Sequence, residues 1–194
     1  MVDYVNSCSI CARNKSRQHW SYSYLKQLPI PLQPWDSISI DFIEQLPPSD
    51  GFTEILMIID QLTKQAVFIP AYRSINTPGL AYLFIQHIFS KHRVPSHITL
   101  DKRSEFVSRF FKSLATTLQM KLYHTSDYHP EADGQTKRTN QTLEQYLRTY
   151  CNYQQLDWVQ LLPLAEFTYN NVSSATMKES LFFANKGYHP QLQI

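Results

Sequence analysis

The sequence predicts an α/β fold in which one five-stranded mixed sheet carries helices on both faces. Five short segments are rich in β-branched and aromatic residues, and between them lie segments whose apolar residues recur at helical spacing. Their order is three strands, a helix, a strand, a helix, a strand and then further helices, which is typical of a mixed sheet covered on both sides. At 194 residues, of which 43% are hydrophobic, the chain is long enough to bury one sizeable core.

The first three strands are expected to form an antiparallel meander over residues 37–43, 53–60 and 65–71. In the first strand, Ile38, Ile40 and Phe42 alternate with other residues and so lie on one face of the sheet. The run from Pro47 to Gly51, with two prolines and a glycine, indicates the turn between the first two strands.

Apolar residues at helical spacing predict the helices, and two short strands lie between the first three of them. The first helix has Asn76 as its cap and Pro78 in its first turn. The helices are predicted at 77–92, 105–118, 134–153, 158–170 and 180–184, and the strands at 96–101 and 121–125. The buried side of the third helix is predicted to comprise Thr142, Leu143, Tyr146, Leu147 and Tyr150.

Composition and charge favour an intracellular protein without a membrane segment. The formal net charge of +2 neither predicts nor opposes nucleic-acid binding. The cysteines Cys8, Cys11 and Cys151 are odd in number and lack the spacing of a disulfide framework, which indicates a reducing compartment. No apolar run approaches the roughly 20 residues of a membrane span, and the first residues lack the hydrophobic stretch of a signal peptide.

The globular domain is predicted to cover residues 35–194, after a segment at 1–19 and a proline-containing, extended linker at 20–34. Cys8 and Cys11 have the Cys-x-x-Cys spacing that supplies half of a tetrahedral zinc site, and two further Cys or His ligands are needed to complete it. His19 is one candidate ligand. The alternative is a reduced pair of thiols that binds no metal.

Three aspartates occupy positions at which α/β proteins place their sites. Asp41 interrupts the apolar first strand, Asp60 ends the second, and Asp101 ends the fourth. If the first and fourth strands are neighbours, Asp41 and Asp101 come close together. Proteins commonly use a pair of carboxylates to bind Mg²⁺ ions that contact phosphate groups. The alternatives are an edge-strand aspartate facing solvent for Asp41 and a helix N-cap for Asp101. The pattern alone does not separate the three acids.

Longer motifs surround two of these acids. They are Ser39-Ile40-Asp41-Phe42, then Ile98-Thr99-Leu100-Asp101 followed by Ser104-Glu105-Phe106, and finally Tyr128-His129-Pro130 with Asp133-Gly134-Gln135-Thr136 and Arg138-Thr139-Asn140. With these motifs the chain, from about Cys8 to its end, resembles the integrase core of gypsy-type LTR retrotransposons. The resemblance implies an RNase H-like fold. It also implies an Asp, Asp, Glu triad that uses Mg²⁺ or Mn²⁺ to trim the element's DNA ends and join them to target DNA.

The resemblance assigns the first two triad positions to Asp41 and Asp101, and the third to Lys137. The family has thirty-five residues between the second aspartate and the glutamate, and 137 − 101 = 36 is the matching step here. The family's Gly-Gln-Thr-Glu-Arg is therefore Gly-Gln-Thr-Lys-Arg in this chain. An ammonium repels cations and supplies no oxygen ligand, so strand transfer is predicted to be severely reduced or absent. A salt bridge from Lys137 to Asp41 or Asp101 is the expected result.

A second departure from the family lies beside Asp101, where its Asp-x-Gly is Asp101-Lys102-Arg103. Glycine permits backbone geometry that arginine does not, so the local geometry of Asp101 is expected to differ. Lys102 and Arg103, together with Lys137 and Arg138, are candidate contacts to a phosphate backbone.

Other acids near the third position are poor replacements for the missing glutamate. Glu144 is seven residues further along the helix, which is about 10 Å by the helical rise. Glu105 is expected to form a local ion pair. Glu131, predicted to lie on the loop before the helix, is the remaining candidate for an enzyme that is still active.

The resemblance further implies DNA as the partner, both the element's ends and the target, with a homodimer of the core, a nuclear location and no membrane. It also implies an N-terminal His-His-Cys-Cys zinc module in which Cys8 and Cys11 would be the last two ligands. No histidine precedes them here, so we interpret the chain as an excised or decayed piece of a polyprotein. The alternative to an integrase enzyme, from a different functional class, is a non-enzymatic nucleic-acid-binding or dimerisation module.

Overall fold

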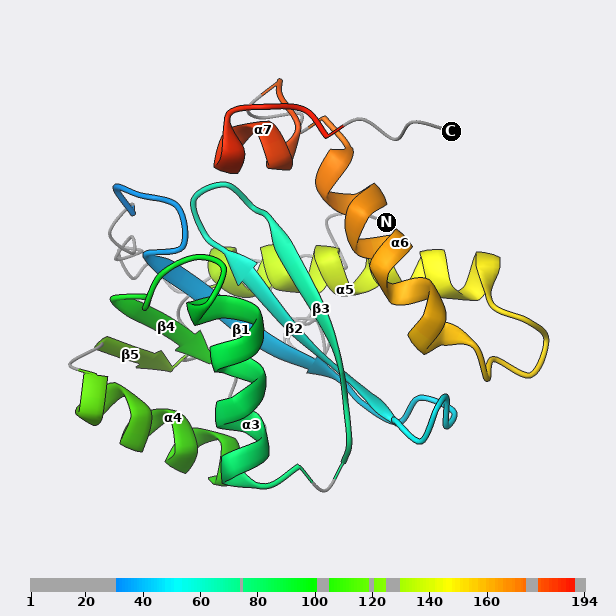
Figure 1. Ribbon diagram of the computed structural model, residues 1–194, viewed down its shortest axis with the longest axis horizontal. Helices are drawn as coiled ribbons and strands as arrows, with labels where there is room; N and C mark the ends of the chain where they lie inside the picture. The colour runs from blue at the N-terminus through cyan, green and yellow to red at the C-terminus, as the bar shows by residue number, and fades with distance from the viewer. Residues whose placement is uncertain are drawn as a thin grey trace, which may run out of the picture.

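The computed structural model describes residues 31–73, 75–100, 105–118, 121–124, 130–173 and 178–190. Within them one sheet has the strand order β3-β2-β1-β4-β5 (Figure 1). β1 pairs antiparallel with β2 and parallel with β4, β2 pairs antiparallel with β3, and β4 pairs parallel with β5. The strands are β1 (Ser37–Ile43), β2 (Glu54–Asp60), β3 (Ala66–Ala71), β4 (His97–Leu100) and β5 (Lys121–His124). The predicted five-stranded mixed sheet with its antiparallel meander is confirmed.

Helices cover both faces of this sheet, as predicted (Figure 1). They are α3 (Thr77–Phe84), continued by a π-helical turn η1 (Ile85–Phe89), then α4 (Glu105–Leu118), α5 (Pro130–Tyr150), α6 (Trp158–Asn171) and α7 (Leu181–Lys186). The largest differences from the predicted boundaries are in two helices. The first helix ends in the π turn at Phe89, and α5 begins at Pro130 rather than Gly134. Proline is favoured at the first position of a helix, which accounts for the earlier start and makes Glu131 a helical residue.

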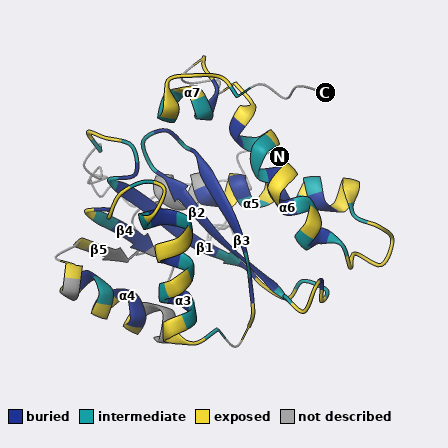
Figure 2. Cartoon of the chain, in the orientation of Figure 1, coloured by how far each residue is buried: buried dark blue, intermediate teal, exposed yellow. Residues whose placement is uncertain are grey.

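Two apolar cores lie on opposite sides of the sheet. On one side, Ile38 and Ile40 pack with residues of α3 and α4 such as Phe84 and Phe111. On the other, Ile43 packs with residues of α5 and α6, Leu143 and Trp158 among them. β2 is buried along its whole length, and in Figure 2 the buried colour follows the strands while exposed residues lie on the outer sides of the helices.

The buried side of α5 differs in part from the predicted one. Leu143 and Leu147 are buried, but Thr142 and Tyr150 are exposed. The buried row instead continues backwards through Thr139 and Thr136. These positions recur at steps of three and four residues, so the face that meets the sheet is polar at one end of the helix and apolar at the other.

Side chains of α6 close the outer edge of β3. Asn170 accepts a hydrogen bond from Ala66 N at 2.9 Å and donates one to Ala66 O at 2.8 Å. Glu166 accepts a hydrogen bond from Phe68 N at 2.8 Å. The next backbone position that points outward on this edge is Pro70, which has no N–H to offer. Ala66, Phe68 and Pro70, the three residues of β3 whose backbone nitrogens point outward, therefore present no free N–H group.

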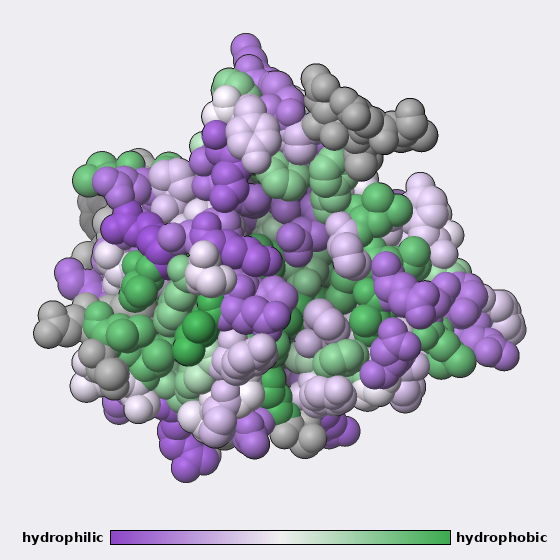
Figure 3. Space-filling view, in the orientation of Figure 1, coloured by the Kyte–Doolittle hydropathy of each residue, from purple (hydrophilic) through white to green (hydrophobic). Residues whose placement is uncertain are grey.

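The face seen in Figure 3 exposes apolar side chains in two areas, on the side of α3 and along α6. They include Tyr82 and Ile85 in the first area, and Leu164 and Val172 in the second. Among the described helices, none combines the length and apolar character that crossing a membrane requires.

Candidate active site

Asp41 lies on the central strand of the sheet and is buried, with 7% of its surface exposed. The alternative of an edge-strand aspartate facing solvent is therefore wrong. Alternation along β1 directs Ile38 and Ile40 to the α3 side, so Ser39 and Asp41 face α5. Thr99 of β4, which pairs with Ser39, is buried too. A row of polar side chains thus lies beneath one end of α5.

The Asp41 carboxylate is held by one hydrogen bond from its own strand and one from α5. Phe42 N donates to Oδ1 at 2.9 Å, and Asn140 Nδ2 donates to Oδ2 at 2.6 Å. Donors of this kind offset part of the cost of burying a charge. The sequence places Asn140 in the motif Arg138-Thr139-Asn140 without indicating a role for it. The structure shows that Asn140 is an α5 residue that contacts Asp41.

The other half of the Asn140 amide has no visible partner. Its Oδ1 is buried, and no described residue lies within hydrogen-bonding distance of it. Buried polar atoms without partners are rare, and a functional site is one of the places where they occur. Asn140 Oδ1 and Trp35 Nε1 are the two such atoms among the described residues, and the first lies beside Asp41 in what we call the Asp41 corner, formed by Asp41, Asn140 and the turn of α5 that carries Lys137.

Lys137 lies on α5 one turn before Asn140, and its side chain is exposed. Positions three apart on a helix are neighbours, about 4.5 Å apart along the axis. One residue before Lys137 the helix contacts β1, because Thr136 Oγ1 donates to Ser39 Oγ at 3.3 Å. Lys137, which the resemblance aligns with the third triad position, is thus on the turn of α5 that meets the polar row. The predicted salt bridge from Lys137 to Asp41 or Asp101 stays a prediction.

Asp101, Lys102 and Arg103 lie outside the described residues, as do Cys8 and Cys11 with the whole of 1–30. What is described is the strand that leads to Asp101. β4 is parallel to β1, and its last residue, Leu100, pairs with Ile40. Each of these two residues directly precedes an aspartate in the sequence, Asp101 and Asp41 respectively.

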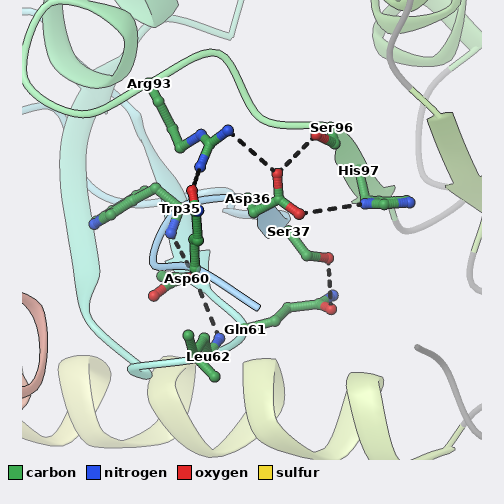
Figure 4. Close-up of polar contacts among 10 residues, drawn as sticks. Trp35, Asp36, Ser37, Asp60, Gln61, Leu62, Arg93, Ser96 and His97 are labelled. Carbon is green, nitrogen blue, oxygen red and sulfur yellow. Dashed lines mark hydrogen bonds and ion pairs between the residues drawn. The ribbon is translucent and has the colours of Figure 1, made fainter. Parts of the chain in front are cut away.

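Asp60 is excluded from this corner. It pairs with Ile38, three residues before Asp41, which is about 10 Å along the strand. It is fully buried and accepts hydrogen bonds from Trp35 N at 3.0 Å, Leu62 N at 3.3 Å, Thr63 N at 2.9 Å and Thr63 Oγ1 at 2.6 Å. These contacts hold the β2–β3 turn and the start of the domain together (Figure 4).

Two polar groups near Asp60 also have structural roles. Trp35 is buried and stacks on His92, with ring centroids 3.8 Å apart. Asp36 accepts a hydrogen bond from Ser96 at 2.7 Å and lies 3.8 Å from Arg93, with His97 on its other side at 4.0 Å (Figure 4). Both sets join the start of β1 to the segment before β4.

Among the described residues, the Asp41 corner contains one carboxylate, that of Asp41, with the Asn140 amide hydrogen-bonded to it and Lys137 one turn earlier on α5. In this part of the chain no three His, Cys, Asp or Glu side chains are grouped so that they could hold a metal ion. Glu144, two turns beyond Lys137, is paired with Arg148 at 3.0 Å instead.

Comparison with known proteins gives relatives in sequence and in fold. The chain is 34% identical over 190 residues to the transposon Tf2-3 polyprotein of Schizosaccharomyces pombe, and to the same extent to the Tf2-4 polyprotein. These alignments cover 98% of the chain, which spans only 14% of the length of either polyprotein. No family model matches the chain.

Solved structures share the fold at low sequence identity. One is a chain of the simian T-cell lymphotropic virus intasome in complex with PP2A regulatory subunit B56 gamma, with a TM-score of 0.70 and 19% identity over 100% of this chain and 67% of that one. Another is the HTLV-2 integrase catalytic core domain in complex with magnesium, in a trimeric form, with a TM-score of 0.57 and 18% identity over 78% of this chain and 96% of that one.

Proposed function

We propose that this chain, an integrase-like region related to retrotransposon polyproteins and folded like retroviral integrase cores, descends from an enzyme of DNA integration and is itself catalytically impaired. The activity would be that of the gypsy-type integrase core, the processing and joining of DNA ends. The observation that carries the impairment is the lysine at the third triad position, on the α5 turn next to Asn140 and Asp41.

The parallel pairing of β1 with β4 supports Asp41 and Asp101 as the two remaining triad acids. Their preceding residues, Ile40 and Leu100, are register partners, and parallel strands that continue in register bring following residues side by side. The magnesium-bound HTLV-2 core is a relative in fold, which supports Mg²⁺ or Mn²⁺ as the ancestral cofactor. A lysine beside the two acids would repel such ions and so weaken their binding.

We test the impairment with Lys137→Glu, alone and with Arg103→Gly. Restoring the third acid is expected to tighten Mn²⁺ binding at least about tenfold, or about 1.4 kcal/mol, and to allow strand transfer on DNA ends that the original chain does not join. The matched control is Arg148→Glu, the same change of charge eleven residues further along α5. If Lys137→Glu changes Mn²⁺ affinity no more than the control does, the defect lies elsewhere. Mn²⁺-dependent strand transfer by the unmodified chain that disappears in Asp41→Asn would show that no impairment exists.

A non-enzymatic nucleic-acid-binding or dimerisation module is the second candidate. Two adjacent cations, Lys137 and Arg138, are exposed on α5, and Lys102 and Arg103 are further candidates for phosphate contacts. The HTLV-2 core is described in dimeric and trimeric forms, which supports self-association of the core. DNA affinity that falls steeply with salt, with a smaller slope in Lys137→Gln, would favour this candidate. Failure to bind duplex DNA at about 50 mM salt would argue against it.

The proposal extends to the remaining features of the chain. Residues 1–19 would be the end of a zinc-binding module with Cys8 and Cys11 as two of its ligands, 20–34 a linker, and 35–194 the catalytic core. The partners would be DNA and a second copy of the core, with no membrane, and the location nuclear. Zinc binding by residues 1–19 is tested by measuring the zinc content of the purified full chain and of its Cys8→Ser variant.

A further inference from the structure

A cavity of about 540 Å³ lies between α5, α6, β3 and α7, and neither Asp41 nor Asn140 is among its lining residues. Its walls are the middle of α5, the second half of α6, β3 at Phe68 and the start of α7 at Leu181. A volume between about 300 and 1,000 Å³ is that of ordinary small-molecule sites. The cavity is therefore large enough for a ligand of one or two rings.

The floor of this cavity is apolar and rigidly packed. Leu143, Ala165 and Phe68 line it and have 2%, 3% and 5% of their surfaces exposed. All three belong to the core that joins α5 and α6 to the sheet. Because these side chains are already fixed by the fold, an apolar ligand body would meet a preformed surface and lose little to reorganisation.

One wall carries a pair of hydroxyl groups. Thr139 Oγ1 and Tyr169 OH are 2.9 Å apart and share a hydrogen bond. Burial raises the pKa of Tyr169, so its phenol stays neutral at physiological pH. A neutral hydroxyl pair adds polarity to the wall without adding negative charge.

The charged residues that line the cavity are all cations. Lys64 and Arg138 lie on its walls, and no Asp or Glu occurs among its described lining residues. Lys64 Nζ donates to Gln61 O of the β2–β3 turn at 2.6 Å; burial lowers the pKa of Lys64, and the neighbouring Asp60 carboxylate opposes that shift. A cation that is partly removed from water interacts more strongly with a bound anion than one in bulk solvent does.

We propose that this cavity binds a small amphipathic anion, one or two apolar rings that carry a single carboxylate. The rings lie on Leu143, Ala165 and Phe68, and the carboxylate is directed towards Arg138 and Lys64. The apolar floor and the two cations of the rim together favour this class, since a neutral ring would add no charged contact at the rim and a small inorganic anion would not cover the floor. The site uses no residue of the Asp41 corner, and it stands whether or not the chain acts on DNA.

The test is calorimetric titration of the full chain with 2-naphthoate and with the neutral 2-naphthamide. We expect naphthoate to bind at least about tenfold more tightly than the amide, equivalent to about 1.4 kcal/mol. In Arg138→Gln, naphthoate affinity should fall about fivefold or more while amide affinity stays the same. The matched control is Arg148→Gln, the same change on the same helix at an exposed position outside the cavity lining, and it should leave both affinities unchanged.

A second variant tests the apolar floor independently of charge. Ala165→Leu fills the space above the floor and should abolish binding of both probes, provided that its circular dichroism matches that of the unmodified chain. If that variant does not fold, Thr142→Leu at the exposed rim of the cavity replaces it. Equal affinity for acid and amide, equal losses in Arg138→Gln and Arg148→Gln, or no naphthoate binding at about 1 mM would each overturn the proposal.

Discussion

Asp60 and Asp41 are both buried carboxylates in the middle of one sheet, but they are held in different ways. Asp60 is surrounded by its own turn, since Leu62 and Thr63 supply three of its hydrogen bonds and Trp35 supplies the fourth. Asp41 accepts a hydrogen bond from Asn140, which lies 99 residues away on a helix of another layer and leaves its own Oδ1 without a described partner. Asp60 is therefore held mainly by its own turn, whereas Asp41 is held in part by a helix of another layer.

The largest expected effect comes from removing the carboxylate that is held locally. Asp60→Ala leaves buried N–H groups of Trp35 and Thr63 without an acceptor, and the free energy of unfolding should fall by about 3 kcal/mol or more. Urea denaturation measures it. Glu44→Ala, at an exposed position just after β1, serves as the control and should stay within about 0.5 kcal/mol of the unmodified chain. A loss below about 1 kcal/mol for Asp60→Ala would contradict the structural role assigned to it.

A smaller effect is expected at the donor of Asp41. Asn140→Ala removes one hydrogen bond to a charged acceptor, and the free energy of unfolding should fall by about 1 to 2 kcal/mol. Gln141→Ala, the exposed neighbour on α5, is the matched control in the same urea titration. Equal losses at the two positions would mean that the contact between α5 and Asp41 contributes nothing to stability.

A third prediction concerns how stability depends on pH through His92, whose ring stacks on Trp35. Burial, with help from Lys186 and Lys91, lowers the pKa of His92 to about 4. Between the ordinary value of 6.5 and about 4, the unfolded chain therefore binds a proton that the folded chain does not, so stability falls as pH falls through this window. His92→Phe keeps an aromatic ring on Trp35 and should reduce this loss by about 1 kcal/mol, a figure discounted because the ring is only half buried. Denaturation at pH 7 and pH 5 measures it, and an unchanged pH dependence would refute the assignment.

The smallest effect is expected at Glu166, an acid with a single backbone donor in Phe68. Burial raises its pKa above the ordinary 4.5, so the folded chain binds a proton more readily than the unfolded one. Stability should accordingly increase as pH falls from neutral towards 4.5. Glu166→Gln retains an acceptor for Phe68 N and should be more stable at pH 7 by less than about 1 kcal/mol. Thermal unfolding at pH 7 and pH 5 tests this, and a variant that is less stable at pH 7 would show that the charge itself is favourable.

Periodicity predicted the sheet and the helices because each strand and helix has a face that must be buried. Ile38, Ile40 and Phe42 predicted one face of β1 correctly, and the meander followed from short turns. The boundaries that differed depend on local chemistry. Pro130 starts α5 four residues before the predicted Gly134, and the π turn at Ile85–Phe89 ends its helix early.

The candidate site was predictable in part. The motifs and the resemblance they carry led to Asp41 and Lys137. The strand pattern alone could not separate Asp41 from Asp60, because their difference lies in donors that only the folded chain brings together. Asn140 was open to prediction, since it follows Lys137 by one helical turn and is an amide at the same face. The shift of the buried side of α5 to Thr136 and Thr139 was not, because threonine occurs as readily on exposed faces.

The closed edge of β3 has a consequence for how this chain behaves in concentrated solution. Strand edges with free N–H groups recruit other strands and so begin aggregation. Here Asn170 and Glu166 occupy two outward donors and Pro70 removes the third. The opposite edge, β5, is only four residues long. The chain is thus expected to remain a discrete folded particle whatever chemistry it performs, because the features that limit its assembly into fibres lie at the sheet edges and not at the candidate site.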